Sequence, residues 1–398
     1  MRILHVNKYG SMRSGADRYF LRAAEELAAR GHTVAVLCAN PVDVPASLPF
    51  YDVPPIDFHE AASTADRLRA ASNVLWSNAA GEAMKGAIED FEPEVVHYHN
   101  YAHQLSNSVL QPVPADVATF YTAHDYKLVC PAYIAQRDGQ PCFRCSEGTV
   151  LHCVSGSCLH GSKSWSALAA LEAIVTRRRS LVPETLIAPS RYMAEQLQNS
   201  WLADTSSRVV HLTNPVDPPA QAPSNPPSGD TGIYVGRLSS EKGLPLAVEA
   251  AARSGVRLLL VGEGPERAAL EELAFNRGAP VEFTGYLSGA ELERTWREAS
   301  FFILPSTWPE NAPLSILEAM VRGKAVVATD VGGQPEVVRR FGGRVVASGD
   351  SAALAEAFRA AAAGEVPVTD RNEVLAEHGW PNHLERLERI YLGAFDAN

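Results

Sequence analysis

The sequence predicts an α/β protein with two doubly wound domains, and three observations support this prediction. Short apolar runs alternate with amphipathic helical patterns up to about residue 190, and the same alternation starts again near residue 231. A proline-rich segment, residues 215–230, separates the two series and cannot form a packed element. The length of 398 residues suits two or three domains at roughly 100–200 residues each. Such alternation favours parallel sheets with ligand sites at the carboxyl ends of the strands.

The first domain is expected over residues 1–214. An apolar strand at 3–7 leads through a glycine-containing loop into a helix over 17–30, which ends before Gly31. Further strands are predicted at 33–38, 95–98, 117–122 and 186–188, and a further helix at 164–179. Residues 124–160 interrupt this rhythm with cysteine, glycine and polar residues, so we expect an irregular insert there.

The second domain is expected over residues 231–375, after the linker. Strands are predicted at 232–235, 257–261, 281–284, 301–304 and 325–328, and helices at 246–254, 267–276, 289–298 and 314–322. The remaining residues, 376–398, place Leu384, Leu387, Ile390 and Leu392 on one face and predict a C-terminal helix.

Composition excludes several classes of protein. Hydrophobic residues make up 46% and charged residues 20%, which is ordinary for a soluble globular chain. The net charge of −11, without a long basic tract, argues against a nucleic acid partner. No apolar run approaches the length of a membrane-spanning helix, and MRILHV enters a strand without an apolar leader. We therefore expect a cytoplasmic protein.

Two cations follow the first strand of the second domain. The loop GRLSSEKG at 236–243 carries Arg237 and Lys242, five residues apart at a strand-to-helix turn. The planar guanidinium and the compact ammonium group can face one diphosphate together. The alternative is a solvated loop with ordinary surface cations.

Two carboxylates follow a later strand of the same domain. Glu310 lies in a loop and Glu318 lies eight residues later, in the following helix, for which Pro313 fits the first turn. The N–H groups of that turn can receive phosphate or sugar oxygens. The carboxylates can accept hydrogen bonds from the hydroxyls of one polyhydroxy ligand, although isolated residues of this kind are more often a cap and a surface charge.

Together these segments resemble the retaining glycosyltransferases of family 4, which have the two-domain GT-B fold. The resemblance covers essentially the whole chain and rests on GRLSSEKG, VGEGPE at 261–266 and the Glu310–Glu318 pair. The spacing from the Arg/Lys loop to the acidic pair, the N-terminal glycine loop and the His124-Asp125 pair fit as well. It implies two Rossmann-like domains that face each other across a cleft, with the C-terminal helix crossing back to the first domain.

The resemblance also implies roles for individual residues. Arg237 and Lys242 would bind the donor diphosphate and stabilise the leaving nucleoside diphosphate, and Glu318 would hold the ribose. Glu310 would contact the donor sugar and His124 the transferring sugar. The remaining donor contacts would come from backbone and neighbouring groups: Gly15 in the first domain, Tyr286 and Leu287 near the base, and Asn311, Ala312, Pro313 and Leu314 beside the sugar.

In this family the configuration at the anomeric carbon is retained, and same-face attack needs neither a side-chain nucleophile nor a divalent cation at the diphosphate. A UDP-sugar is the favoured donor and a GDP-sugar the second choice. The acceptor would be a carbohydrate or a lipid-linked glycan in cell-surface polysaccharide assembly. A small natural-product acceptor such as an aminocyclitol is the alternative.

Other classes of enzyme remain open at this point. Gly262 and Gly264 follow a strand, as in a dinucleotide fingerprint, and Glu282 stands near the expected acidic position. The third glycine is missing, because Arg267 stands there, so an NAD-dependent oxidoreductase is only weakly indicated. A nucleotide-sugar epimerase or a phosphorylase is closer, but no pyridoxal-lysine signature is identified.

Five of the six cysteines crowd into the insert. Cys130, Cys142, Cys145 and Cys158 form our candidate zinc site, in which Cys153 or His152 could replace one ligand. Reduced thiols or disulfides are the alternative, whereas Cys38 reads as a core residue. The stretches HDYKLVCP and RDGQPCFRC resemble those of some family 4 members with bacterial polysaccharide-type sequences, so the cluster indicates a subgroup feature.

A helical segment at 164–179 is the candidate for peripheral membrane contact. It contains Trp165, Leu168, Leu171 and Ile174 between Lys163 and the basic run Arg177–Arg179, which suits a surface that touches anionic lipid. An ordinary core-facing helix with a basic end is the alternative, and the acidic net charge favours it.

Overall fold

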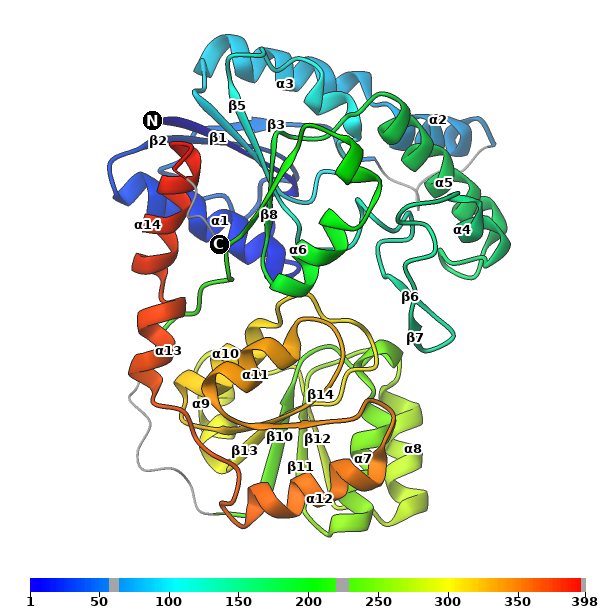
Figure 1. Cartoon of the computed structure of the whole chain (residues 1–398), viewed down its shortest axis with the longest axis vertical. Helices are drawn as coiled ribbons and strands as arrows, with labels where there is room; N and C mark the ends of the chain where they lie inside the picture. The colour runs from blue at the N-terminus through cyan, green and yellow to red at the C-terminus, as the bar shows by residue number, and fades with distance from the viewer. Residues whose placement is uncertain (57–63, 220–228, 395–398) are drawn as a thin grey trace. The chain divides into compact units, whose positions relative to one another are not determined.

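The structure, a computed structural model of the chain, describes residues 1–56, 64–219 and 229–394 (Figure 1). It divides into two compact units. The first holds Met1–Arg137, Cys142–Leu212 and the chain from Leu384 onward, and the second holds Asp138–Pro141 and Thr213–His383. Each unit contains a parallel sheet with helices, which confirms the predicted pair of doubly wound α/β domains.

The sheet of the first unit has the strand order β3-β2-β1-β4-β5-β8-β9 among the described residues, and every pairing is parallel. Its strands are β1 (Arg2–Tyr9), β2 (Thr33–Ala39), β3 (Phe50–Asp52), β4 (Val95–Tyr98), β5 (Ala118–Thr122), β8 (Thr185–Ala188) and β9 (Arg208–His211). The chain moves outward from β1 in one direction and then from β4 in the other. The β1–β4 boundary is therefore the topological switch point, where open α/β sheets bind ligands.

The helices of this unit are α1 (Gly15–Ala29), α2 (Thr64–Leu75), α3 (Asn78–Phe91), α4 (Leu151–Ser155), α5 (Lys163–Arg178) and α6 (Arg191–Gln198). Helix α1 begins where Ser14 accepts a hydrogen bond from the Asp17 N–H, and it buries Phe20 and Leu27. Helices α3 and α6 are not predicted from the sequence, although Ser77 and Ser190 cap them in the same way.

The second unit contains the order β12-β11-β10-β13-β14-β15, again parallel throughout. Its strands are β10 (Thr231–Val235), β11 (Arg257–Val261), β12 (Val281–Gly285), β13 (Phe301–Leu304), β14 (Ala325–Thr329) and β15 (Arg344–Val346). Its helices are α7 (Leu244–Ser254), α8 (Arg267–Arg277), α9 (Gly289–Glu298), α10 (Leu314–Val321), α11 (Gln334–Phe341), α12 (Ser351–Ala362) and α13 (Arg371–His378). The switch point of this sheet lies between β10 and β13.

The C-terminal segment differs from the single helix expected over 376–398. Helix α13 ends at His378, and α14 (Trp380–Tyr391) starts after Gly379. Within α14 the chain leaves the second unit and joins the first, where Glu388 forms a 2.7 Å ion pair with Arg30. Of the predicted linker, 220–228 lie outside the described residues, as do 395–398 at the C-terminus.

The predicted insert carries only short elements, which are β6 (Gln136–Arg137), β7 (Gln140–Pro141) and α4. Helix α5 follows it, but the expected core-facing side is only partly right. The helix buries small and polar residues, among them Ala169, Ala170 and Glu172, while Trp165 and Leu171 are exposed. Glu172 can be buried because the Lys127 ammonium lies 2.7 Å from its carboxylate.

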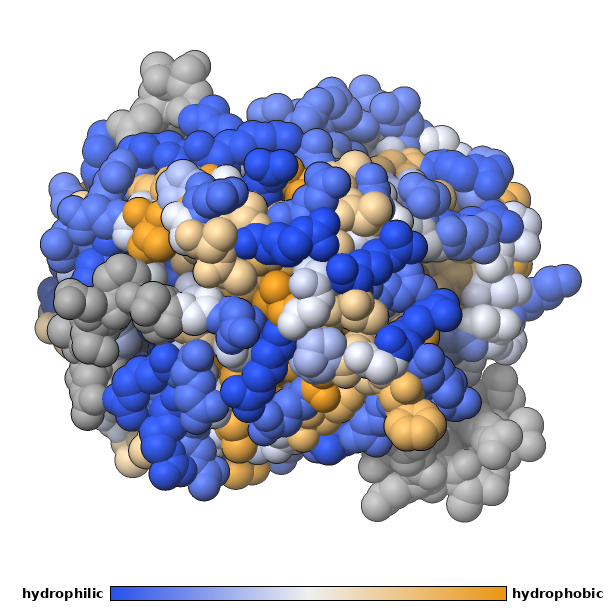
Figure 2. All heavy atoms as spheres, turned by 90° about the horizontal axis from the view of Figure 1, so that it is seen from below, coloured by the Kyte–Doolittle hydropathy of each residue, from blue (hydrophilic) through white to orange (hydrophobic). Residues whose placement is uncertain are grey.

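Among the described residues, none of the helices combines the length and the apolar character that a membrane-spanning segment requires. Figure 2 shows one face of the molecule, on which hydrophobic residues are interspersed with hydrophilic ones.

Candidate functional site

The loops at the carboxyl ends of the strands of the second unit pack directly on one another. A Cβ atom on Gly262 would lie 1.9 Å from the carbonyl oxygen of Gly236, and one on Gly264 would lie 2.1 Å from that of Leu238. These glycines are therefore required by the contact between the β10 and β11 loops. The glycines thus have a packing role that needs no dinucleotide. Glu282, the expected acidic residue of a dinucleotide site, is exposed and paired with Arg257. The dinucleotide interpretation therefore loses its main support.

Lys242 and Glu310 meet at the switch point of this sheet. The Lys242 ammonium lies 2.7 Å from Glu310 Oε1, and the Ser306 hydroxyl donates to the same oxygen at 2.6 Å. The Glu310 residue is only 5% exposed, so the carboxylate is buried, and both of these contacts are made to its Oε1. The sequence had assigned these two side chains to different parts of the donor, and the structure brings them together as a pair.

Arg237 differs from Lys242 in its surroundings. Its side chain is exposed and has no hydrogen-bond or ion-pair partner among the described residues, whereas its carbonyl accepts a 2.8 Å hydrogen bond from the Tyr234 hydroxyl. The backbone is thus anchored while the guanidinium remains available to an anion.

Helix α10 starts at Leu314, with Pro313 at the N-cap rather than in the first turn, and no side chain caps its first N–H groups. Ala312 is held by a hydrogen bond from the Asn214 amide to its carbonyl, and Asn311 is buried. Glu318 lies one turn into the helix, half-buried, and its carboxylate has no partner among the described residues. The open helix start and this carboxylate are available to a ligand with phosphate and hydroxyl groups.

The two residues predicted near the base follow β12. Tyr286 is 77% exposed, and Leu287 is partly buried against the core. An exposed aromatic face beside the strand ends offers a surface for a planar ring.

Gly15 is the first residue of α1 in the first unit. The loop before it is organised by Asp17, whose carboxylate accepts hydrogen bonds from the Asn7 amide at 2.9 Å and the Ser14 hydroxyl at 2.8 Å. Asp17 is buried and therefore holds the loop rather than facing a ligand.

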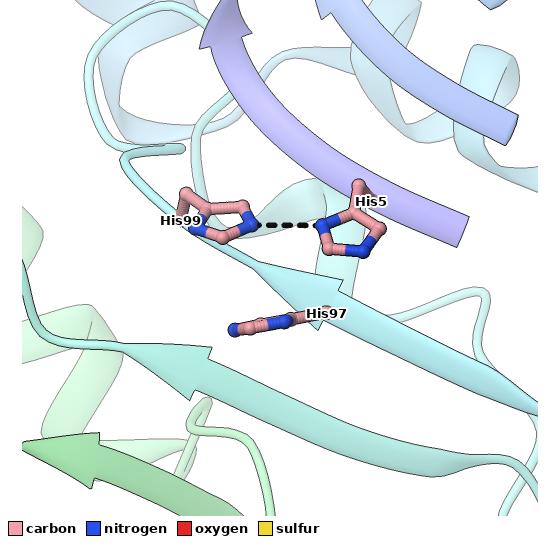
Figure 3. Close-up of side chains that lie close together, drawn as sticks. All are labelled: His5, His97 and His99. Carbon is pink, nitrogen blue, oxygen red and sulfur yellow. Dashed lines mark hydrogen bonds between the residues drawn. The ribbon is translucent and has the colours of Figure 1, made fainter. Parts of the chain in front are cut away.

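A line of hydrogen-bonded histidines leads from the core to His124, and Figure 3 shows its first bond, between His5 and His99, with His97 beside it. His5 Nδ1 lies 3.0 Å from His99 Nε2, and His99 Nδ1 lies 3.0 Å from His124 Nε2. Burial lowers the pKa of His5 and of His124 to about 3, and lowers the pKa of His99 well below its ordinary value. All three imidazoles are therefore neutral at physiological pH.

His97 lies beside this line, because parallel pairing of β1 and β4 places it opposite His5. His5, His97 and His99 bring ligand atoms within 4.8 Å of one another, as a metal site would. However, His97 is already bonded through Nδ1 to the Tyr391 hydroxyl at 2.6 Å and through Nε2 to the Thr122 hydroxyl at 2.8 Å. With those nitrogens engaged, the trio is better described as a hydrogen-bonded core than as a vacant metal site.

Sequence reasoning missed His5, His97 and His99 altogether. The signal was the His-Tyr-His triplet at the end of a predicted strand, since residues two apart on a strand share a face.

A cavity of about 150 Å³ opens at the switch point of the first sheet, with His124 adjacent in sequence to its lining residue Asp125. It lies where β1, β4 and β5 end and is lined by Lys8, Asn100, Tyr101, Ala102, His103, Tyr121, Asp125, Lys127, Leu128 and Tyr133. Asn100 Oδ1 and His103 Nε2 are buried without a hydrogen-bond partner among the described residues. Unsatisfied polar atoms around a cavity of this size indicate a site for a polar ligand.

The cysteines occupy two places. Cys38 is buried in β2 against Gly10, where a Cβ on the glycine would lie 2.6 Å from the sulfur. The five others line a single small cavity in the insert, and no disulfide joins any of the cysteines, all of which lie in the described part of the chain.

Comparison with known families gives two matches that divide the chain as the fold does. The family described as Glycosyltransferase Family 4 matches residues 13–218, and that described as Glycosyl transferases group 1 matches residues 221–377. Among curated proteins, phosphatidyl-myo-inositol mannosyltransferase of Mycobacterium leprae is 27% identical over 401 residues, covering 95% of this chain and 92% of the relative.

Sulfoquinovosyl transferase SQD2 of Arabidopsis thaliana is 37% identical over 107 residues, 27% of this chain. The chain covers only 20% of that relative's length, and 63% of the length of the matched alpha-maltose-1-phosphate synthase of Mycobacterium tuberculosis.

Solved structures agree on the fold. Sucrose-phosphate synthase of Thermosynechococcus elongatus has a TM-score of 0.69 at 19% identity, covering 99% of this chain and 98% of the other. Anabaena HepE, solved in complex with UDP, has a TM-score of 0.64 at 16% identity, covering 99% and 100%. The architecture is that of the GT-B glycosyltransferases. Because the match to Glycosyltransferase Family 4 spans more than half of this chain, the chain belongs to that family.

Proposed function

We propose that this protein is a retaining glycosyltransferase that moves a sugar from a nucleoside-diphosphate sugar to a hydroxyl acceptor. The observation that carries the proposal is the arrangement at the switch point of the second sheet, where an uncommitted Arg237 and the Lys242–Glu310 pair accompany the uncapped start of α10. A UDP-sugar is the favoured donor, because HepE was solved with UDP; a GDP-sugar is the alternative, by similarity to a GDP-mannose-dependent mannosyltransferase.

The chemistry follows from charge. Cleavage of the sugar–phosphate bond builds negative charge on the diphosphate, which Arg237, Lys242 and the N–H groups of α10 stabilise without reorganising. Glu310 accepts hydrogen bonds from Lys242 and Ser306 at Oε1, so this oxygen positions the ammonium, and Oε2 would accept hydrogen bonds from the sugar hydroxyls. We propose same-face attack, in which the departing phosphate takes the acceptor proton and the configuration is retained.

Glu318, Tyr286 and Leu287 complete the proposed donor contacts. The unpaired Glu318 carboxylate would accept hydrogen bonds from the ribose hydroxyls, and the exposed Tyr286 with Leu287 would cover the base. Asn311 to Leu314 would present their backbone to the donor sugar.

We assign the acceptor to the cavity of about 150 Å³ in the first unit, which can hold one six-membered ring. We place His124 at the transferring sugar and Gly15 against the donor or acceptor. Asn100 Oδ1 and Asp125 would accept hydrogen bonds from hydroxyls, and Lys8, which has no ion-pair partner among the described residues, would donate. A hydroxylated ring, either the terminal sugar of a glycan in cell-surface assembly or a cyclitol, fits this lining.

Peripheral membrane contact is proposed for the face formed by α4 and α5. Leu151, Trp165 and Leu171 are exposed on these two helices, and Arg177 and Arg178 lie in the last turn of α5. A protein bound to the inner face of the membrane would use this surface to reach a lipid-linked acceptor. The Trp165→Ser/Leu171→Ser variant should sediment less with anionic vesicles than the unchanged chain, and equal sedimentation would remove this part of the proposal.

The donor site is tested by thermal shift of the full chain with UDP, GDP and NAD⁺. Binding to the native state raises the unfolding midpoint. We expect a shift with one nucleoside diphosphate that is lost in Arg237→Ala and kept in Arg253→Ala, an exposed arginine outside the site. A shift with NAD⁺ alone would overturn the proposal in favour of an oxidoreductase. Transfer activity of Arg237→Ala should fall about 100- to 1000-fold, the cost of one lost charge-stabilising donor.

A further inference from the structure

The cysteine-rich insert gathers five thiols around a cavity of about 20 Å³, which is room for one water molecule or one metal ion. We propose that Cys130, Cys145, Cys153 and Cys158 bind a single structural zinc ion in this cavity. The site does not depend on the proposed glycosyl transfer, and it changes the ligand set expected from the sequence, in which Cys142 stood in place of Cys153.

Packing separates the four proposed ligands from Cys142. Cys145 and Cys153 are buried in one small apolar cluster, and Cys130 and Cys158 pack against it as partly buried members. Cys142 also lines the cavity but does not belong to this cluster. The C-x2-C spacing pointed to Cys142 because adjacency in sequence is visible there, whereas the position of Cys153 depends on the fold of α4.

The sulfurs are not yet as close together as the ligands of one bound ion. In the described part of the chain, the histidine trio is the one group of three or more possible ligand residues whose ligand atoms all lie within 4.8 Å of one another. The thiols would therefore close on the ion by rotation about χ1.

A metal here would cross-link a segment that has few other stabilising elements. The four cysteines come from the start of the insert, its middle, helix α4 and the turn after it. The regular structure between them is limited to a two-residue strand pair and α4, and the apolar cluster is small. Zinc binding would therefore supply much of the folding free energy of the insert.

The test is metal content of the full chain, purified under reducing conditions without chelator. We expect one zinc per chain, lost in Cys153→Ser and retained in Cys142→Ser, its matched control on the same cavity. Loss in Cys142→Ser with retention in Cys153→Ser would overturn this ligand set. A metal-free chain with all five thiols reacting, or with a disulfide by mass, would overturn the site.

Should Cys153→Ser fail to fold, cobalt substitution of the unchanged chain keeps the proposal testable. Thiolate-to-cobalt absorption of a four-sulfur tetrahedral site is expected, and its absence would contradict the proposal. Metal content and absorption are independent of transferase activity, so a failed metal site and a failed functional assignment are distinguishable.

The hydrogen-bonded line of histidines supports a second and independent inference, which rests on the proposed function only for its catalytic meaning. We infer that His5 and His99 are positioning residues that keep the proton of His124 on Nδ1. His5 Nε2 is buried and has no hydrogen-bond partner among the described residues, so the line ends there.

The unpartnered His5 Nε2 decides the direction of both hydrogen bonds in the line. A proton on His5 Nε2 would be a buried donor with no acceptor, which is the rarer and less favourable arrangement. The proton therefore lies on Nδ1, and His5 donates to His99 Nε2. His99, neutral, then carries its own proton on Nδ1 and donates to His124 Nε2. His124 is left with a proton on Nδ1, where it can donate to an oxygen of the transferring sugar.

The tautomer of His124 can be measured by ¹⁵N NMR of the full chain labelled at histidine. We expect Nδ1–H in the unchanged protein and in His99→Gln, whose amide still has one acceptor and one donor. His99→Phe removes both the donor and the acceptor, so His124 should become a mixture of its Nδ1–H and Nε2–H tautomers. Protonation at Nε2 in the unchanged protein would overturn the inference.

Tyr391→Phe is the matched control, because it removes the bond to His97 without touching the line. It should leave the His124 tautomer unchanged. In His99→Phe we expect kcat to fall about 10- to 100-fold with little change in the KM of the donor, as for a misplaced reacting group. A correct tautomer in a protein without transferase activity would refute the proposed function and leave this inference standing.

Discussion

The two units share one topology but place opposite kinds of chemistry at their switch points. In the first, neutral histidines in a buried line approach a cavity of about 150 Å³. In the second, Arg237, Lys242, Glu310 and Glu318 supply charge near the surface, and only Glu310 is deeply buried. The difference teaches that the fold provides a place for a ligand, while the loop residues decide whether a charged diphosphate or a hydroxylated ring suits it.

The loops differ in construction as well. In the second unit the glycines let neighbouring loops touch backbone to backbone, which holds the charged groups without a large cavity. In the first unit, side chains such as Asp17 and Tyr98 organise the loops by hydrogen bonds and leave a hollow between them.

The two units should differ most strongly in how acid affects their stability. The lowered pKa values of His5, His99, His103 and His124 all belong to the first unit. Because the unfolded state gains these protons near pH 6.5 and the folded state only far lower, the stability of the first unit falls as pH drops below 6.5. Each histidine contributes up to about 1.4 kcal/mol per pH unit.

Hydrogen exchange of the full chain at pH 7.5 and pH 5.5 measures this effect unit by unit. The sheet of the first unit should lose protection at pH 5.5 well before the sheet of the second. Equal loss in both units would show that the histidine line does not set the acid sensitivity.

Gly262→Ala should reveal how strongly the second unit depends on loop contact. The added Cβ would lie 1.9 Å from the Gly236 carbonyl oxygen, and the residue has a φ of +137°. Overpacking together with backbone strain should cost about 3 kcal/mol of the free energy of unfolding. Urea denaturation measures it, and a loss below 1 kcal/mol would mean that the loops can separate freely.

Lys242→Met isolates the ion pair at the same switch point. The substitution leaves the buried Glu310 carboxylate without its cation, so the free energy of unfolding should fall by about 2–4 kcal/mol. Lys242→Met/Glu310→Gln removes both charges and should recover part of the loss. If the single and double variants are equally destabilised, the pair does not act as a unit.

Gly86→Ala should give the smallest effect, and in the opposite direction. Gly86 lies in the middle of α3, and a Cβ there would meet nothing within 4 Å. Alanine should stabilise the first unit by about 0.5–1 kcal/mol through helix propensity. Urea denaturation of Gly86→Ala and Gly262→Ala measures both free energies of unfolding, and so compares a glycine with free space around it with one that is tightly packed.

Much of the fold followed from local pattern. The strands at 95–98, 257–261 and 301–304 and the helix at 289–298 have the predicted bounds, since apolar runs and helical periodicity are local properties. Helices α3 and α6 were missed although serines cap them. The face of α5 was assigned only in part, because an ion pair with Lys127 lets Glu172 lie inside.

By itself the sequence determined the two α/β domains and the loops that carry Arg237, Lys242, Glu310 and Glu318, because each depends on residues close together in the chain. Only the tertiary structure decided that Lys242 pairs with Glu310, that His5 and His99 line up behind His124, and that Cys153 joins the thiol cluster while Cys142 stays at its edge. These relations depend on strand register and loop packing between residues distant in the chain, which no local pattern encodes.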